Sequence, residues 1–217
     1  MPTTEIAVFP LVAGSNIGDP DSAAGKVVKD TFDTLKATDG MQQIQFGTRV
    51  EDPTVMQLLI NWEAKKFHDD FIAAEAYGPF MKTLGAIIGG APILFCHADF
   101  KPEGSLNKTL SAPVTEIAVF GFDGGPPDDY LDNVDKLRQI LDEEKPDGYL
   151  GISGGVTYEE IEKDGVKGKA AVVAIGWQSV EVHMAFRESQ SFKDNIHLLR
   201  SSAKSVDMKH VAFMQAL

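Results

Sequence analysis

The sequence has few of the features that distinguish special classes of protein from ordinary globular proteins. It has one cysteine, Cys96, which excludes an internal disulfide and a metal site built from several cysteines. Because Leu94 and Phe95 precede it, we expect this thiol to be a small buried hydrophobe. No run approaches about 18 apolar residues, and residues 1–10 lack a basic segment followed by an apolar core. We therefore expect a cytoplasmic protein without a membrane span.

Positive charge is also scarce. The chain has 20 Lys and Arg against 32 Asp and Glu, a formal net charge of −12. Such a chain repels phosphate backbones and anionic membranes, so we expect neither nucleic acid nor a membrane as a partner. A content of 43% hydrophobic and 24% charged residues is typical of a folded soluble protein.

Two stretches of the sequence occur twice. Residues 62–71, WEAKKFHDDF, return as WQSVEVHMAF at 177–186, with Trp, His and Phe at the same spacing. Upstream, TEIAVF at 4–9 recurs letter for letter at 115–120. Two matches in the same order indicate a duplicated unit of about one hundred residues.

Hydrophobic periodicity predicts the same order of elements in both copies. In the first copy we expect strands at 5–12, 41–50, 55–62 and 91–100, a helix capped by Ser22, and a second helix broken at Gly78-Pro79. In the second copy we expect a first strand that ends at FDGGPPDD, further strands at 149–157, 169–177 and 209–216, and helices at 128–144 and 180–205. Each copy then reads β-α-β-β-α-β.

This order is that of ferredoxin-like folds, in which two helices cover one face of a four-stranded antiparallel sheet. The bare sheet faces of two such repeats can pack on each other, so the predicted fold is α+β, an intrachain α+β barrel. We expect the first repeat at 1–100, a linker at 101–114, which is polar and carries two prolines, and the second repeat at 115–217.

The element order, a Trp that closes the third strand, and a following helix with His-x-x-Phe together resemble the antibiotic biosynthesis monooxygenase-like domains of the dimeric α+β barrel superfamily, fused in tandem as in fungal proteins. The resemblance implies a cofactor-independent enzyme of secondary metabolism. It would oxygenate or cyclise an aromatic or polyketide-like substrate in an apolar pocket between sheet and helices. A non-catalytic ligand-binding or stress-associated barrel is the alternative, and a haem-binding protein is the third. Haem-degrading relatives carry an Asn on the first strand, which IAVFPL and IAVFGF lack.

The candidate catalytic residues are histidines and a tyrosine. His68 and His183 lie beside the apolar stripe near the start of their helices, where a neutral imidazole could act as a general base. By resemblance to cyclases, Tyr77 would join His68, and Tyr149 would join His183. His97 is a further candidate, because the Trp offset places Ala212 at the matching position of the second copy.

The remaining expectations concern the cavity wall and the partners. Trp62 and Trp177 are expected to pack in the core or to form a wall with Phe71 and Phe186. His197 and His210 read as a helix-surface and a strand-end residue. No pair of histidines has the i, i+4 spacing, so we expect no metal. The expected partner is a small hydrophobic or aromatic molecule, bound by a monomer with an internal pseudo-dimer or by a weak homodimer.

Overall fold

The structure is a computed structural model that describes residues 2–216 of the chain. It divides the chain into two compact units. The first unit holds residues 2–97 together with 214–216, and the second holds residues 98–213. Each unit has strands and helices in the order β-α-β-β-α-β, so the predicted α+β class with two ferredoxin-like repeats is confirmed.

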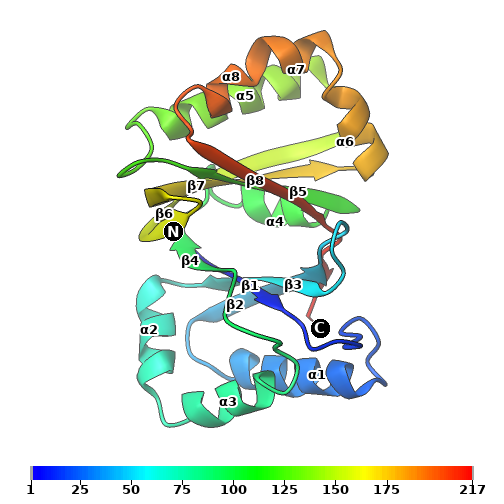
Figure 1. Cartoon of the computed structure of the whole chain (residues 1–217), viewed down its shortest axis with the longest axis vertical. Helices are drawn as coiled ribbons and strands as arrows, with labels where there is room; N and C mark the ends of the chain where they lie inside the picture. The colour runs from blue at the N-terminus through cyan, green and yellow to red at the C-terminus, as the bar shows by residue number, and fades with distance from the viewer. Residues whose placement is uncertain (1, 217) are drawn as a thin grey trace. The chain divides into compact units, whose positions relative to one another are not determined.

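The first unit has an antiparallel sheet with helices on one face (Figure 1). The strands, in sheet order, are β4 (Leu94–Ala98), β1 (Thr3–Pro10), β3 (Val55–Trp62), β2 (Met41–Thr48) and β9 (Met214–Gln215). The helices are α1 (Ala23–Lys36), α2 (Lys65–Ala73) and α3 (Tyr77–Leu84). The short β9 pairs with β2, so residues near the end of the chain complete the sheet of the first unit.

The local sequence explains these elements. Ser22 caps α1, and its hydroxyl accepts a hydrogen bond from the Gly25 N–H at 2.8 Å, as the sequence predicts. In β1, Ala7 and Phe9 point to the helix-covered face and belong to the core of the unit. The helical break lies earlier than expected: α2 ends at Ala73, and Pro79 sits in the first turn of α3, where its missing N–H is not needed.

The second unit repeats this plan with a longer hairpin. Its strands, in sheet order, are β8 (Ser205–Val211), β5 (Val114–Gly121), β7 (Val166–Trp177) and β6 (Tyr149–Lys163). Its helices are α5 (Tyr130–Glu144), α6 (Val180–Phe186), α7 (Gln190–Asn195) and α8 (His197–Arg200). The single helix expected at 180–205 is therefore three short ones, because Ser189 caps a new start for α7.

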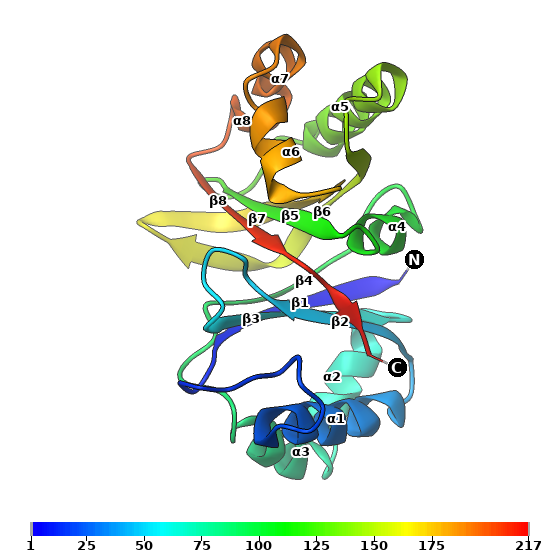
Figure 2. The ribbon, with the colours of Figure 1, turned by 90° about the vertical axis from the view of Figure 1, so that its right-hand side faces the viewer.

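The segment expected to be a linker is folded onto the second unit. Residues 105–110 form α4 (Ser105–Leu110), whose Leu106 and Leu110 are buried. Figures 1 and 2 show α4 on the face of the sheet opposite to α5. The Ser105 hydroxyl donates to Ser153 Oγ on β6 at 2.8 Å, which ties this helix to the sheet. The polar composition of 101–114 therefore conceals one short amphipathic helix.

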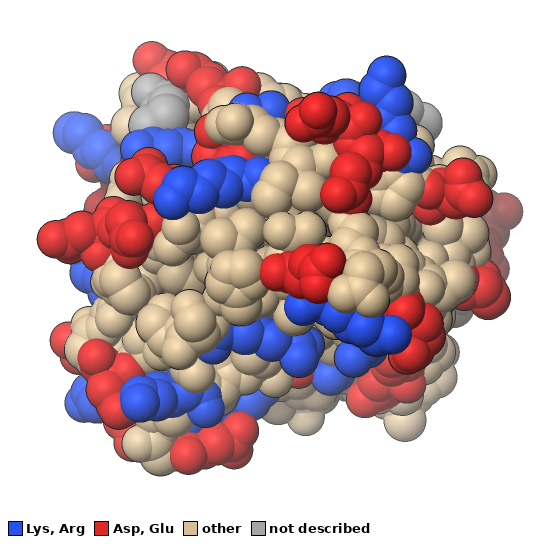
Figure 3. Space-filling model, turned by 90° about the horizontal axis from the view of Figure 1, so that it is seen from above, with Lys and Arg blue, Asp and Glu red and all other residues tan. Residues whose placement is uncertain are grey.

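The surface carries charge of both signs. On the face drawn in Figure 3, Lys and Arg side chains are interspersed with Asp and Glu. Pairs one helical turn apart, such as Lys29 with Asp33 at 2.5 Å and Arg138 with Asp142 at 2.9 Å, account for part of this pattern. Among residues 2–216, no helix is both long enough and apolar enough to span a bilayer.

Candidate functional site

The site of the first unit begins with a buried carboxyl on β1. Glu5 points to the same face as Ala7, under the helices. In the β1–β3 pairing, Glu5 is opposite Ile60 and Thr3 is opposite Trp62, so Glu5 and Trp62 are diagonal neighbours on that face. The Trp62 indole N–H donates to Glu5 Oε2 at 3.0 Å. The carboxyl thus has one neutral donor within the sheet.

Two histidines extend this pair. His68, in α2, stacks on Trp62 with ring centroids 5.0 Å apart and planes 10° apart. Its Nδ1 lies 2.7 Å from Nε2 of His97, on β4, and 3.4 Å from Glu5 Oε2. The exposed fractions are 6% for Glu5, 3% for His68 and 2% for His97, so water hardly reaches this chain of proton-carrying groups. We call Glu5, Trp62, His68 and His97 the first tetrad.

The second unit contains the same arrangement, which we call the second tetrad: Glu116, Trp177, His183 and His210. The Trp177 N–H donates to Glu116 Oε2 at 3.2 Å, and Trp177 stacks on His183 at 4.9 Å. His183 Nδ1 is 2.7 Å from His210 Nε2. The tetrads differ in one contact, since His183 turns Nε2 to Glu116 at 3.2 Å whereas His68 turns Nδ1 to Glu5.

Both tetrad carboxyls titrate near neutrality. Burial raises the pKa of Glu5 to about 7, against a smaller lowering by the Trp62 hydrogen bond. Burial likewise raises the pKa of Glu116 to about 7, and here the charges of Arg187 and Arg200 act with the Trp177 hydrogen bond in the opposite direction. A carboxyl poised in this range can accept or release a proton at physiological pH.

A cavity of about 220 Å³ adjoins the first tetrad. Its polar members are Glu5, His68 and Tyr77. The rest of the wall is apolar: Phe9, Leu35, Leu58, Ile60, Phe71, Phe80, Met81, Leu84, Pro92 and Phe95. The structure therefore brings Tyr77 and Phe71 together with His68, as expected. Trp62 and His97 are not among the described wall residues. Trp62 is fully buried, which agrees with the expected core packing rather than with the alternative of a cavity wall.

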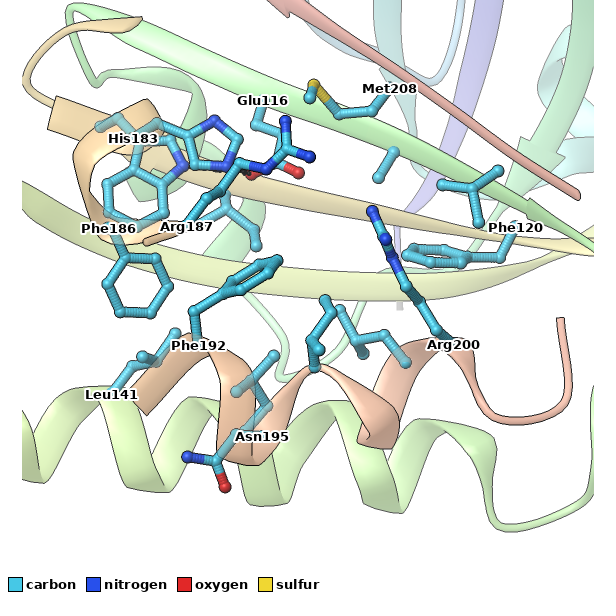
Figure 4. Close-up of a pocket in the computed structure, with 17 residues that line it drawn as sticks. Glu116, Phe120, Leu141, His183, Phe186, Arg187, Phe192, Asn195, Arg200 and Met208 are labelled. Atoms are coloured by element: carbon cyan, nitrogen blue, oxygen red, sulfur yellow. Dashed lines mark hydrogen bonds and ion pairs between the residues drawn. The ribbon is translucent and has the colours of Figure 1, made fainter. Parts of the chain in front are cut away.

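The corresponding pocket of the second unit is smaller, at about 40 Å³ (Figure 4). Trp177, His183 and Phe186 line it, as expected. Tyr149 is not among its described lining residues. Its ring meets Trp177 edge-on at 6.0 Å and its hydroxyl donates to Asp142 at 3.3 Å, so the expected meeting of Tyr149 with His183 in one cavity is wrong.

The structure also corrects the matching of His97. Its counterpart is His210, not Ala212, because each contacts the helix histidine of its unit at 2.7 Å. The spacing shrinks from 115 residues at the Trp pair, 62 and 177, to 113 at 97 and 210, since the segment before the last strand is two residues shorter in the second copy. His210 is 2% exposed and lies one residue before the end of β8, which agrees with the expected strand-end position.

Glu5 and Glu116 were missed altogether. The signal was present, because TEIAVF recurs unchanged and its glutamate falls on the same face of the strand as the apolar Ala and Phe positions. A charged side chain directed toward a hydrophobic core is rarely there for packing. Its exact repetition in both copies marks it as part of the site.

A close backbone approach positions the histidine helix. Gly40 has φ +75°, and a Cβ there would lie 2.1 Å from Cγ of Phe67 in α2. Its carbonyl accepts the Glu63 N–H at 2.7 Å, just before the helix starts. Gly148 has φ +69°, and its carbonyl accepts the Gln178 N–H at 2.8 Å in the second unit. Glycine at this turn lets the helix begin against the strand and places the imidazole over the indole.

Three residues of the first tetrad could hold a metal ion. Glu5, His68 and His97 each offer a ligand atom, and these atoms lie within 4.8 Å of one another. The two imidazole nitrogens are only 2.7 Å apart, a hydrogen-bonding distance. Two nitrogens bound to one tetrahedral zinc are about 3.3 Å apart, given bonds of about 2.0–2.1 Å. The arrangement thus favours a shared proton over a shared ion.

Comparison with known proteins gives a fold. No family model matches the chain, and no curated protein matches it. An anthrone oxidase-like protein of known structure has a TM-score of 0.66 at 13% identity, covering 98% of this chain and 91% of that chain. A candidate monooxygenase from Fusobacterium nucleatum has a TM-score of 0.62 at 11% identity, covering 98% and 92%. Another from Lactobacillus acidophilus has a TM-score of 0.59 at 14% identity, covering 99% and 95%. Over nearly its whole length, the chain has the fold of these monooxygenase-type structures.

Proposed function

We propose that the first unit is an enzyme that takes a proton from a flat, largely apolar molecule and thereby allows molecular oxygen to oxidise it. The observation that carries this proposal is the position of Glu5 and His68 in the wall of an apolar cavity of about 220 Å³. An ionisable pair in a water-poor cavity is the arrangement that proton abstraction from a weak acid needs.

Each member of the first tetrad has a part in this chemistry. Glu5, with a pKa of about 7, accepts the substrate proton in its ionised form. His68 and His97, joined at 2.7 Å, can take up charge and shift a proton away from the carboxyl. The Trp62 N–H steadies the carboxylate at 3.0 Å. The Phe95 ring lies 6.0 Å from His68 and 5.9 Å from His97, where it shields the imidazoles from solvent.

The similarity to an anthrone oxidase-like fold supports tricyclic ketones with an activated CH₂ as the substrate class. Removal of one C–H proton leaves an enolate, which transfers an electron to O₂. Recombination and protonation give a hydroperoxide. Loss of the second C–H proton breaks the O–O bond, forming C=O and releasing water. The sum is R₂CH₂ + O₂ → R₂C=O + H₂O, with the substrate as the only reductant.

A specific observation favours a second candidate, a non-catalytic ligand-binding barrel. The second unit keeps the whole tetrad beside a pocket of only about 40 Å³, which is too small for such a substrate. In this candidate, the second tetrad serves the packing of helix against sheet. The same could hold in the first unit, with its cavity used for binding alone.

Oxygen consumption with anthrone distinguishes the two candidates. We expect the protein to accelerate O₂ uptake and anthraquinone formation over the rate in buffer. Glu5→Gln should lower kcat by about a hundredfold or more, because general-base catalysis contributes about 10²–10⁴-fold. Glu116→Gln is the matched change in the other unit and should alter kcat less than about twofold. Binding of anthrone without O₂ uptake would select the second candidate, and equal kcat for Glu5→Gln and wild type would refute the base.

A further inference from the structure

The second pocket keeps the frame of the first but differs from it in charge. From Trp62 to Leu84 and from Trp177 to Leu199, the two copies align without a gap. On this alignment, Arg187 stands where the first unit has Ile72, and Arg200 follows Leu199 where Gly85 follows Leu84. The first cavity has no Lys or Arg among its described lining residues, whereas the second has these two arginines.

Both guanidinium groups are directed into the pocket. Figure 4 shows Arg187, directly after the end of α6, reaching toward Glu116, and Arg200 reaching from α8 toward the sheet near Phe120. Within residues 2–216, neither has a carboxylate within ion-pair distance, and the recorded contact of Arg187 is with Met184 Sδ at 3.7 Å. Arg138 of the same unit, by contrast, is held by Asp135 at 2.7 Å and Asp142 at 2.9 Å.

The wall around these cations is apolar and aromatic, with Phe120, Leu141, Phe186 and Phe192. We propose that the second pocket is a binding site for a small organic monocarboxylate with an aromatic or branched apolar body, whose carboxylate lies between Arg187 and Arg200. Guanidinium groups pair well with carboxylates because they are planar, weakly hydrated and able to donate two parallel hydrogen bonds. The phenylalanine rings would bury the apolar body.

Charge and size select the ligand further. With Glu116 ionised, Arg187, Arg200 and this carboxylate sum to +1 and balance a monoanion, whereas with Glu116 protonated the two arginines sum to +2. A volume of about 40 Å³ holds a carboxylate group but not a whole aromatic ring, for which about 150 Å³ is needed, so the ring of the ligand would lie at the mouth of the pocket. The two units would thus take ligands of different charge. This inference does not depend on the reaction proposed above, since binding can be measured without turnover.

Calorimetric titration of the full chain with benzoate, and with benzyl alcohol as its neutral match, tests the proposal. We expect benzoate to bind more tightly than benzyl alcohol by at least tenfold. Arg187→Ile, which restores the side chain of the first unit, should weaken benzoate binding about tenfold or more. Arg200→Ala should do likewise, because a hydrogen bond to a charged group contributes that much. Neither change should affect benzyl alcohol.

Arg138→Ala is the control, because it removes a cation of the same unit whose charge is already paired. It should leave benzoate binding unchanged. Arg200 is exposed, so its variant is expected to fold even if Arg187→Ile does not. Equal affinity for the two probes, or unchanged benzoate affinity in Arg200→Ala, overturns the proposal. The result stands whether or not the chain consumes oxygen with anthrone.

Discussion

His68 Nδ1 lies 2.7 Å from His97 Nε2, and the same distance joins His183 to His210. A hydrogen bond of this kind needs one donor and one acceptor, so at most one of its two facing nitrogens carries the proton. The pair therefore holds one proton that can sit on either ring. Both units have kept this contact while the residues around it have changed, for example Ile72 to Arg187.

The tetrad carboxyls should make folding stability depend on pH. The folded protein holds the Glu5 proton to a pKa of about 7, against 4.5 for the ordinary group, so stability from this site is greatest below pH 4.5 and falls as pH rises to about 7. Glu116 behaves alike. A difference of about 2.5 pKa units corresponds to about 3 kcal/mol per site above pH 7. Glu5→Gln should therefore gain stability relative to wild type between pH 5 and pH 8, as urea unfolding followed by Trp fluorescence would show. A constant difference across this range would contradict the raised pKa.

We expect the two strand histidines, His97 and His210, to contribute equally to folding stability and unequally to catalysis. His97→Ala and His210→Ala each remove one hydrogen bond of a buried helix histidine, which costs about 1–3 kcal/mol, with a further loss from the cavity created. Denaturant unfolding should show similar losses for both variants. In the anthrone assay, His97→Ala should also shift the pH profile of kcat, whereas His210→Ala should not. A shift in neither profile would make His97 a purely structural residue.

Tyr77 offers a conservative test of the first cavity. Tyr77 lines the first cavity, and its position corresponds to Phe192 in the second unit. Burial, followed by the charge of Glu5, raises the pKa of the Tyr77 hydroxyl, so it stays a neutral donor. Tyr77→Phe should change the free energy of unfolding by less than about 0.5 kcal/mol. If the hydroxyl orients the substrate, KM for anthrone should rise severalfold, and an unchanged KM would assign Tyr77 to packing.

Gly40 should not tolerate a side chain. Alanine there would have φ +75° and a Cβ 2.1 Å from Phe67 Cγ, so we expect a loss of about 2–4 kcal/mol, from left-handed backbone and overpacking together. The control is Gly78→Ala in α3, where no atom lies within 4 Å of the added Cβ. That change should stabilise the protein by up to about 1 kcal/mol. Thermal unfolding of both variants measures the contrast, and equal midpoints would contradict the close approach.

Metal chelation should leave the first tetrad intact. Because the His68 and His97 nitrogens are at hydrogen-bonding distance, we expect EDTA not to lower the melting temperature. Zinc added at stoichiometric amounts should not raise it, since an ion that binds only the folded state stabilises it. A rise with zinc that Glu5→Gln abolishes would show instead that the three residues form a metal site.

The fold could be predicted from sequence because its signals are periodic and occur twice. The alternation in β1 and the capping Ser22 act locally, and a second copy confirms each of them. The broken second helix was harder to place, since Pro79 is compatible with the first turn of a helix as well as with a break. Only the packing of α3 decides between them.

The site was only partly predictable. His68 and His183 were identified because the short motif around them recurs at constant spacing. His210 was missed because a deletion of two residues before the last strand shifts the alignment, and a sequence offset does not reveal which side chains meet. Glu5 was not predicted because it lies in a strand rich in Ile, Val and Phe, a composition that indicates apolar packing. The pairing of strands and the packing of helices on them bring these groups together, although they lie far apart in the sequence.

Because β9 pairs with β2, the first unit is built from two separate stretches of the chain, and the second unit lies between them in the sequence. Residues 98–213 form an insertion between β4 and the last strand of the first unit. Cutting the chain after residue 97 would not release a complete first half, because Gln45 and Phe46 would lose the edge partners Gln215 and Met214. Met214 and Gln215 follow the inserted copy along the chain, so the first unit is complete only when both ends of the polypeptide are present.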